Sequence, residues 1–151
     1  MTIQIRALEP NDRARWEQMF AAYATFYKTN VPEGGFDRVW AWIEDPSNDF
    51  WCDVAEFDDG RVVGFTQYQL MHRSLSGAMV CYLSDLYVDS EVRGQGAGRA
   101  LIDNVIDFSR ERGITIVRWL TQEGNETARR LYDTYRPKTD FILYNIPVET
   151  P

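Results

Sequence analysis

The stretch that decides the fold runs from Tyr82 to Leu101. It reads Tyr82-Leu-Ser-Asp-Leu-Tyr-Val-Asp-Ser-Glu-Val-Arg-Gly-Gln-Gly-Ala-Gly-Arg-Ala-Leu101. A strand-like apolar run over 78–88 leads into a polar, glycine-containing loop over 89–96. The next segment has a helical apolar face made by Ala100, Leu101, Val105 and Phe108. Gly113 can end that helix in a left-handed cap, so the stretch predicts a strand–loop–helix unit.

The segment after this helix completes a βαβ unit. Ile114–Leu120 is rich in β-branched residues and predicts a strand. Because a helix links it to the strand over 78–88, the two strands should be parallel. Asn125 can cap one more helix, and Thr139–Asn145 predicts a final strand.

The first half of the chain predicts an antiparallel meander and two helices. Ile3 and Ile5 alternate with polar residues, as in a half-buried strand. The two helical faces consist of Trp16, Met19, Phe20, Tyr23, Phe26 and Tyr27, then of Phe36, Val39, Trp40 and Ile43. The runs Phe50–Phe57 and Arg61–Met71 flank a turn and predict a hairpin. We therefore expect one α/β domain over residues 1–151, a mixed α+β sheet whose antiparallel meander leads into a parallel crossover, with helices on both faces.

The composition excludes several classes of function. The chain has 151 residues, 16 Lys plus Arg and 23 Asp plus Glu, which give a formal net charge of −7. This acidity argues against a nucleic-acid-binding face, because phosphate backbones require clustered cations. One histidine and two cysteines do not support a metal site or a Ser–His–Asp triad. The chain has no apolar run long enough to span a membrane, and both cysteines lie in apolar stretches that suit buried, reduced thiols. We therefore expect a cytoplasmic protein without a membrane partner.

The glycine-rich loop indicates an anion-binding turn. Gly94, Gly96 and Gly98 lie where a strand meets a helix, so backbone N–H groups can close around an anion. Arg93 and Arg99 add positive charge and hydrogen-bond donors. The loop lacks the Gly-Lys-Ser/Thr of a P-loop, and the sixth position of a dinucleotide fingerprint counted from Gly94 is Arg99. The loop therefore favours a pyrophosphate ligand other than a Mg-nucleotide or a nicotinamide dinucleotide.

Two motifs resemble the GNAT superfamily of acetyl-CoA-dependent N-acetyltransferases. Arg93-Gly-Gln-Gly-Ala-Gly98 is similar to the family's R-x-x-G-x-G/A signature, and Asn125-Glu-Thr-Ala-Arg-Arg-Leu-Tyr132 is similar to its N-x-x-A-x-x-L/F-Y helix. The two motifs stand in the family's order. The resemblance implies a GNAT-like acyl-CoA N-acyltransferase fold over residues 1–151, with acetyl-CoA as co-substrate and no metal.

The resemblance also implies which residues hold acetyl-CoA. The backbone of the strand before the loop would pair with the pantetheine arm, and the loop amides would hold the pyrophosphate. The residues implied are Leu86, Tyr87, Val88, Arg93, Gly94, Gln95, Gly96, Ala97, Gly98, Arg99 and Asn125.

Two residues are candidates for the catalytic proton transfers. The resemblance implies that Tyr132 protonates the leaving thiolate, and a phenol suits this step because its pKa of ~10 lies above the ~8.5 of a thiol. An alkyl amine must lose a proton before it attacks. Asp85, expected on the face opposite Ser84 and Leu86, is the candidate base or amine-binding group. Ser84 stands where the similar diamine acetyltransferases have a glutamate base.

For the acceptor amine, the resemblance points to the first two helices and the loop between them. The candidate substrate-binding residues are Tyr27, Glu33, Trp42, Asp85 and Glu123. They would form an aromatic and acidic site for a cationic amine, with Glu33 and Glu123 as alternative bases. The sequence favours a polyamine, an amino acid or another small amine and leaves a protein amine open. The family implies a homodimer. The alternative function is a catalytically weak or inactive CoA-binding regulatory or interaction module.

Overall fold

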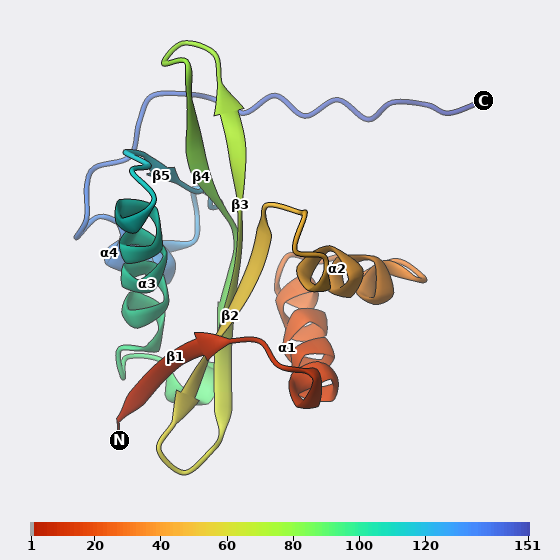
Figure 1. Ribbon diagram of the computed structural model, residues 1–151, viewed down its shortest axis with the longest axis vertical. Helices are drawn as coiled ribbons and strands as arrows, with labels where there is room; N and C mark the ends of the chain where they lie inside the picture. Colours follow the sequence, from red (N-terminus) through yellow and green to blue (C-terminus); the bar gives the residue numbers. More distant parts are fainter. Residues whose placement is uncertain (1) are drawn as a thin grey trace. The chain divides into compact units, whose positions relative to one another are not determined.

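The computed structural model describes residues 2–151 (Figure 1), which divide into two compact units, residues 2–120 and residues 121–151. The strands of the first unit are β1 (Ile3–Ala7), β2 (Phe50–Phe57), β3 (Val62–Arg73), β4 (Ala78–Val88) and β5 (Val117–Arg118). Its helices are α1 (Arg13–Phe26), α2 (Gly35–Glu44) and α3 (Ala97–Glu111), with short 3-10 turns η1 (Pro10–Asp12) and η2 (Ser90–Val92). The second unit contains α4 (Glu126–Tyr132).

The five strands of the first unit form one mixed sheet in the order β1-β2-β3-β4-β5. The first three pairings are antiparallel, whereas β4 and β5 pair in parallel through the crossover helix α3. The predicted meander and the predicted parallel crossover are therefore both confirmed.

Helices cover the two faces of this sheet, with α3 on one face and α1 and α2 on the other (Figure 1). Beneath α3 lies a cluster that includes Phe57, Leu86 and Leu101. Beneath α1 and α2 lies a second cluster built around Trp16 and Phe65. Because residues of β4 alternate between the two clusters, a side chain on this strand can reach either layer.

The ends of the helices follow the local signals in the sequence. Gly113 has a φ of 69° after α3, and its N–H donates to the Arg110 carbonyl while the Ile114 N–H donates to Ser109. This is the Schellman cap that the glycine predicts. The Asn125 side chain accepts a hydrogen bond from the Ala128 N–H, which confirms it as the cap of α4.

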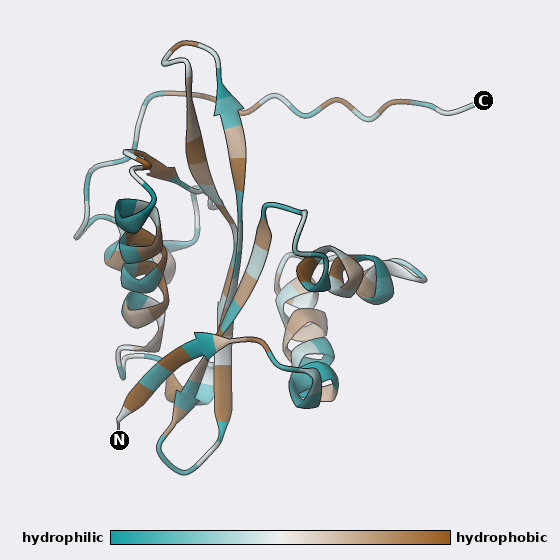
Figure 2. Ribbon diagram, in the orientation of Figure 1, coloured by the Kyte–Doolittle hydropathy of each residue, from teal (hydrophilic) through white to brown (hydrophobic). Residues whose placement is uncertain are grey.

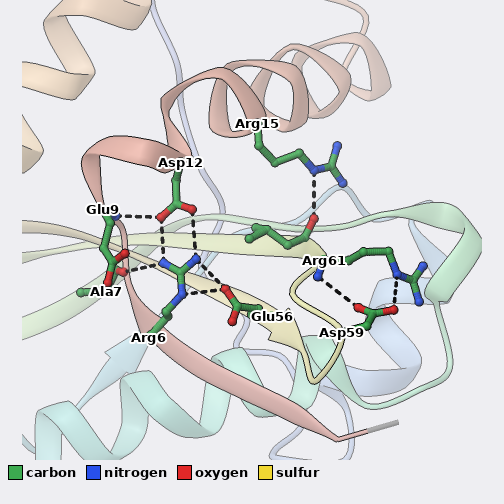
Figure 3. Close-up of polar contacts among 9 residues, drawn as sticks. Arg6, Ala7, Glu9, Asp12, Arg15, Glu56, Asp59 and Arg61 are labelled. Carbon is green, nitrogen blue, oxygen red and sulfur yellow. Dashed lines mark hydrogen bonds and ion pairs between the residues drawn. The ribbon is translucent and has the colours of Figure 1, made fainter.

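An ion cluster joins β1, η1 and β2 ahead of α1. Arg6 donates to Asp12 at 2.8 Å and to Glu56 at 2.7 Å (Figure 3). The Arg6 hydrogen bonds hold the pKa of the Asp12 carboxyl below its usual value. The cluster fixes the segment from which α1 starts against the outer strands of the sheet.

Two strand predictions are wrong: one strand is shorter than predicted, and the other does not form. The strand predicted over 114–120 is reduced to Val117–Arg118, and Thr139–Asn145 forms no strand. A strand needs a partner for its backbone groups. β5 pairs only with β4, at two positions, and across residues 2–151 no strand pairs with the segment 139–145.

Candidate active site

A bulge in β4 creates the polar centre of the first unit. β4 pairs regularly with β3 except at one point, where Gln67 faces Asp85 and Tyr68 faces Leu83. Ser84 is therefore the extra residue of a β-bulge, a feature that re-aims side chains beside it.

The bulge corrects one expectation about Asp85. Gln67 Nε2 donates to Asp85 Oδ2 at 2.8 Å, and Gln69 Nε2 donates to Ser84 Oγ at 3.0 Å. Since the two glutamines are two residues apart on one regular strand, Ser84 and Asp85 reach the same face of the sheet. Leu86 packs under α3 on the opposite face, as predicted.

Asp85 lies at the end of a buried polar chain. The amide of Gln67 that donates to Asp85 also accepts from Trp16 Nε1 at 2.9 Å, and both Gln67 and Trp16 are completely buried. The Tyr23 side chain, from α1, makes a further hydrogen bond to the carboxylate. These contacts fix the orientation of Asp85 toward the layer that contains α1 and α2.

Burial raises the pKa of Asp85 above its ordinary value, and the hydrogen bonds from Gln67 and Tyr23 offset only part of that shift. A carboxylate with a raised pKa binds a proton more readily than an exposed aspartate. This property is the one that a general base needs when it accepts a proton from an ammonium group. Sequence reasoning treated Tyr23 as core and missed Gln67, although two glutamines on one face of a largely apolar strand signal a polar network.

The glycine-rich turn lies between β4 and α3 and is exposed from Arg93 to Gly96. Gly94 and Gly96 have φ angles of 81° and 95°, a region that other residues rarely adopt, and open space surrounds the position of a Cβ at each. The turn delivers the chain into α3, whose first amides at Ala97 and Gly98 have no partner in the preceding helical turn. These N–H groups and the positive end of the helix dipole suit a phosphate or pyrophosphate.

Contacts from α1 and β3 anchor the entrance of this turn. The Asp89 N–H donates to the Val63 carbonyl at 2.8 Å, and the Tyr87 hydroxyl donates to the Asp89 carboxylate at 2.9 Å. Arg15 pairs with the same carboxylate, and its Nε donates to the Val62 carbonyl at 2.9 Å. Burial and the Asp89 hydrogen bond raise the pKa of Tyr87 to about 12, so its hydroxyl stays protonated. Nothing in the sequence around Arg15 indicated that it would contact Asp89 and Val62 at the entrance of the turn.

The outer edge of β4 is open next to the turn. β5 pairs with β4 only at Cys81 and Tyr82, and for residues 86 and 88 the described part of the chain provides no strand on that side. The Asp89 N–H points toward β3, so by strand alternation the N–H groups of Leu86 and Val88 point toward the open edge. An extended ligand chain with amides can pair there as an added strand.

The predicted acceptor residues of the first unit lie at different points of its helical layer. Tyr27 caps the end of α1, and its ring packs on Tyr23 with centroids 5.0 Å apart, next to the residue that contacts Asp85. Trp42 of α2 packs instead on Phe50 at 5.7 Å. Glu33 is exposed in the loop between the two helices. The structure therefore connects Tyr27 to Asp85 through Tyr23 and leaves Glu33 and Trp42 outside that contact chain.

Three predicted site residues belong to the second unit. Asn125 Nδ2 donates to Thr121 Oγ1 at 3.3 Å while its side-chain oxygen caps α4. The Glu123 carbonyl accepts from Arg129 at 2.7 Å. Tyr132 is the last residue of α4. These hydrogen bonds all lie within the second unit.

No group of His, Cys, Asp and Glu side chains within residues 2–151 could hold a metal ion. Over the same range, no helix is both long enough and apolar enough to cross a membrane.

The chain is similar in sequence and in fold to several known proteins. The model of the acetyltransferase (GNAT) family matches residues 16–135. The chain is 34% identical over 143 residues to the D-amino-acid N-acetyltransferase HPA3 of Saccharomyces cerevisiae, covering 94% of this chain and 89% of the yeast protein. It is 33% identical over 92 residues to the thialysine N-epsilon-acetyltransferase of Sus scrofa, covering 56% of this chain and 54% of that protein. The crystal structure of a probable acetyltransferase superposes with a TM-score of 0.81 at 25% identity and covers 100% of both chains.

Proposed function

Because the chain belongs to the GNAT family of acetyltransferases, we propose that it moves the acetyl group of acetyl-CoA to the primary amine of a small cationic acceptor. The observation that carries this proposal is the open edge at Leu86 and Val88, which is followed directly in the chain by the exposed turn from Arg93 to Gly96. The edge suits the amide-containing pantetheine arm, and the turn suits the pyrophosphate.

In this proposal the acetyl group is transferred by direct attack of the amine in a ternary complex. Asp85 takes a proton from the ammonium group, directly or through one water, and so exposes the nitrogen lone pair. The nitrogen then bonds to the thioester carbonyl carbon, and the developing oxyanion accepts a hydrogen bond from a backbone N–H near Leu86. The carbon–sulfur bond breaks as Tyr132 gives its proton to the thiolate, and the remaining extra proton on the acetylated nitrogen passes to the Tyr132 phenolate, directly or through water. The products are an N-acetyl amide and free CoA.

The acceptor class follows from charge and from the relatives. Asp85 offers a carboxylate to a cation, and Tyr23, which contacts it, and Tyr27, which packs on Tyr23, offer aromatic rings. The yeast relative is named for D-amino acids and the porcine relative for thialysine, both of which are amino acids. These names support a free amino acid or a similar small amine as the acceptor here.

We further propose that both compact units contribute to one functional domain. The matched family segment, residues 16–135, crosses the boundary between Leu120 and Thr121. Asn125, Glu123 and Tyr132 would then act with the turn and with Asp85, in a cytoplasmic enzyme.

Replacing Tyr132 with phenylalanine should lower kcat by about 10- to 100-fold and leave the dissociation constant of CoA nearly unchanged, because only the phenolic proton is lost. Stopped assays of thiol release and calorimetric titration with CoA measure the two quantities. An unchanged kcat would remove Tyr132 from the proton transfer. The matched control is Tyr144→Phe, which removes a hydroxyl from an exposed tyrosine outside the proposed site and should leave kcat unchanged.

The test of the function as a whole is acetyl transfer to a panel of amines, followed by release of the CoA thiol. The panel should include D- and L-amino acids, polyamines, aminoglycosides and a lysine-containing peptide.

A further inference from the structure

The carboxylate of Asp89 lies at the entrance of the glycine-rich turn, four residues before Arg93. Its side chain is only 24% exposed, so water and salt screen its charge less than that of a surface carboxylate. The Asp89 N–H donates to the Val63 carbonyl at 2.8 Å, and the Asp89 carbonyl accepts from the Val92 N–H at 3.1 Å. These backbone hydrogen bonds on both sides of the side chain keep the carboxylate next to the turn.

A carboxylate at this place is unfavourable for a site that binds an anion. The chain already has a net charge of −7, and a fixed negative charge beside a pyrophosphate site weakens the binding of the anion. Asp89 would also compete with the pyrophosphate for Arg93. Arg93 is exposed and has no ion pair within residues 2–151, so its donors are available to a ligand.

Two arginines lie near this carboxylate. The Tyr87 hydroxyl donates to Asp89 Oδ1, so charges that act on this hydroxyl lie close to the carboxylate as well. Burial raises the pKa of Tyr87 to about 12, while the positive charges of Arg15 and Arg93 act in the opposite direction. Asp89 therefore has two possible cationic partners, one from α1 and one from the turn itself.

Arg15 is the partner that the fold selects. It belongs to the first turn of α1, which Figure 2 shows as hydrophilic. Its Nη2 pairs with Asp89 Oδ2, its Nε donates to the Val62 carbonyl at 2.9 Å, and its Nη1 donates to Gln18 Oε1 at 2.7 Å. Because each guanidinium nitrogen has its own acceptor, the group is fixed on Asp89.

We propose that Arg15 is a positioning residue for the cofactor: it neutralises Asp89 and thereby leaves Arg93 available to the pyrophosphate of CoA. This inference rests on the proposed function, since it assumes that the turn holds CoA. Arg15 touches no reacting atom and acts only through Asp89. Helix α1 then serves both substrates, because Tyr23 of the same helix contacts the candidate base Asp85.

The test replaces Arg15 with glutamine, which leaves the Asp89 charge without its partner on α1. Calorimetric titration should show the dissociation constant of CoA rising by about 5- to 50-fold, the range expected when contacting charged groups are uncoupled. The KM for acetyl-CoA should rise in parallel, and kcat should stay within about twofold because the reacting groups are unchanged. A merely structural role would lower the folded fraction, and with it the apparent kcat, without raising KM.

Arg13→Gln is the matched control. Arg13 lies on the same helix, its side chain is 30% exposed against 32% for Arg15, and it pairs with Glu17 and Asp37. This variant should keep the dissociation constant of CoA within about twofold. Arg15→Lys keeps the positive charge beside Asp89 and should stay within about threefold of the wild-type value. Circular dichroism checks that each variant is folded.

The double variant Arg15→Gln/Asp89→Asn separates charge from packing. It removes the carboxylate charge together with its partner, so CoA affinity should return to within about threefold of the wild-type value. This variant also decides the matter if Arg15→Gln alone does not fold, since wild-type affinity would show that Arg15 is dispensable once the charge is gone. A double variant that binds CoA about 5-fold or more weakly than the wild type would overturn the inference.

Unchanged CoA affinity in Arg15→Gln, with a wild-type chain that binds CoA, would overturn this inference and leave the proposed function intact. Equal losses in Arg15→Lys and Arg15→Gln would also overturn it, because the charge would then not matter. A wild-type chain that does not bind CoA would overturn the proposed function and this inference together. The titration of the wild-type chain therefore distinguishes the two failures.

Discussion

Replacing Asp85 with asparagine should reduce kcat by about 10²–10⁴-fold, the contribution typical of a positioned general base. Asparagine keeps the size of the side chain and can still accept the hydrogen bond from Gln67 Nε2. It cannot take a proton from an ammonium group. The loss should therefore appear in the chemical step, measured as the rate of thiol release at saturating amine and acetyl-CoA.

The pH dependence of turnover gives the same test a second readout. Asp85 must be ionised to act as a base, and burial raises its pKa above that of an exposed aspartate. Activity should therefore fall on the acid side through this raised pKa, and the residual activity of Asp85→Asn should lack that acid limb.

The raised pKa of Asp85 also predicts how the Asp85→Asn substitution affects the stability of the fold. A carboxyl group whose pKa is higher in the folded state binds protons more tightly there, so the free energy of unfolding falls as pH rises from the unfolded pKa to the folded one. Above this raised pKa Asp85 is ionised at a cost to stability, so Asp85→Asn should not lower the melting temperature there. A variant that loses both activity and stability would contradict this interpretation.

Asp53 provides the matched control. It is also buried, its pKa is also raised by burial, and it accepts hydrogen bonds from the Tyr68 hydroxyl at 2.6 Å and from Asn104 at 2.8 Å. Tyr68 packs on Phe108 of α3, on the face of the sheet opposite Asp85. Asp53→Asn should keep kcat per folded molecule within about twofold, because ordinary substitutions away from the reacting groups do not change the chemical step.

Replacing Gly96 with glutamate should weaken CoA binding by on the order of 100-fold or more. The φ of 95° at this position is strained for any side chain, at about 1–3 kcal/mol, and the glutamate adds negative charge where the pyrophosphate is expected. Calorimetric titration with CoA measures the effect.

Gly60→Glu separates backbone strain from charge at the site. Gly60 has a φ of 89° in the turn between β2 and β3, again with no atom within 4 Å of an added Cβ. This control should lose similar stability and keep its affinity for CoA. Undiminished CoA binding by Gly96→Glu would remove the turn from the site.

The parts of the fold that the sequence predicts correctly depend on local signals. The bounds of β4 follow from its apolar run, the end of α3 from Gly113, and the start of α4 from Asn125. Each of these signals acts within a few residues. The parallel crossover was also predictable, because a helix between two strands leaves few topologies.

The centre of the site was only partly predictable. Asp85 could be singled out beside the glycine-rich turn, but its contacts depend on the pairing of β3 with β4. The bulge at Ser84 is a property of that pairing, and it places Asp85 against Gln67 and Tyr23. A single strand read by itself gives no register, so the alternation of side chains was wrong by one residue at Ser84.

The two strand predictions that fail share a physical cause. Propensity and pattern describe how well residues suit a strand, whereas a strand also needs backbone partners. Residues 114–120 have one partner over two positions, and residues 139–145 have none among those described. The residue types suit strands in both segments, and what the sequence pattern does not supply is the backbone partner.

The most direct measurement of the central claim is acetyl transfer itself, with the full chain, acetyl-CoA and single amines. The account predicts release of one equivalent of CoA for each equivalent of N-acetyl product, identified by mass spectrometry, with free amino acids or similar small amines as acceptors. The Asp85→Asn variant should release little thiol under the same conditions. Tight binding of CoA without acetylation of any amine in the panel would contradict the account and would indicate a CoA-binding module without catalysis.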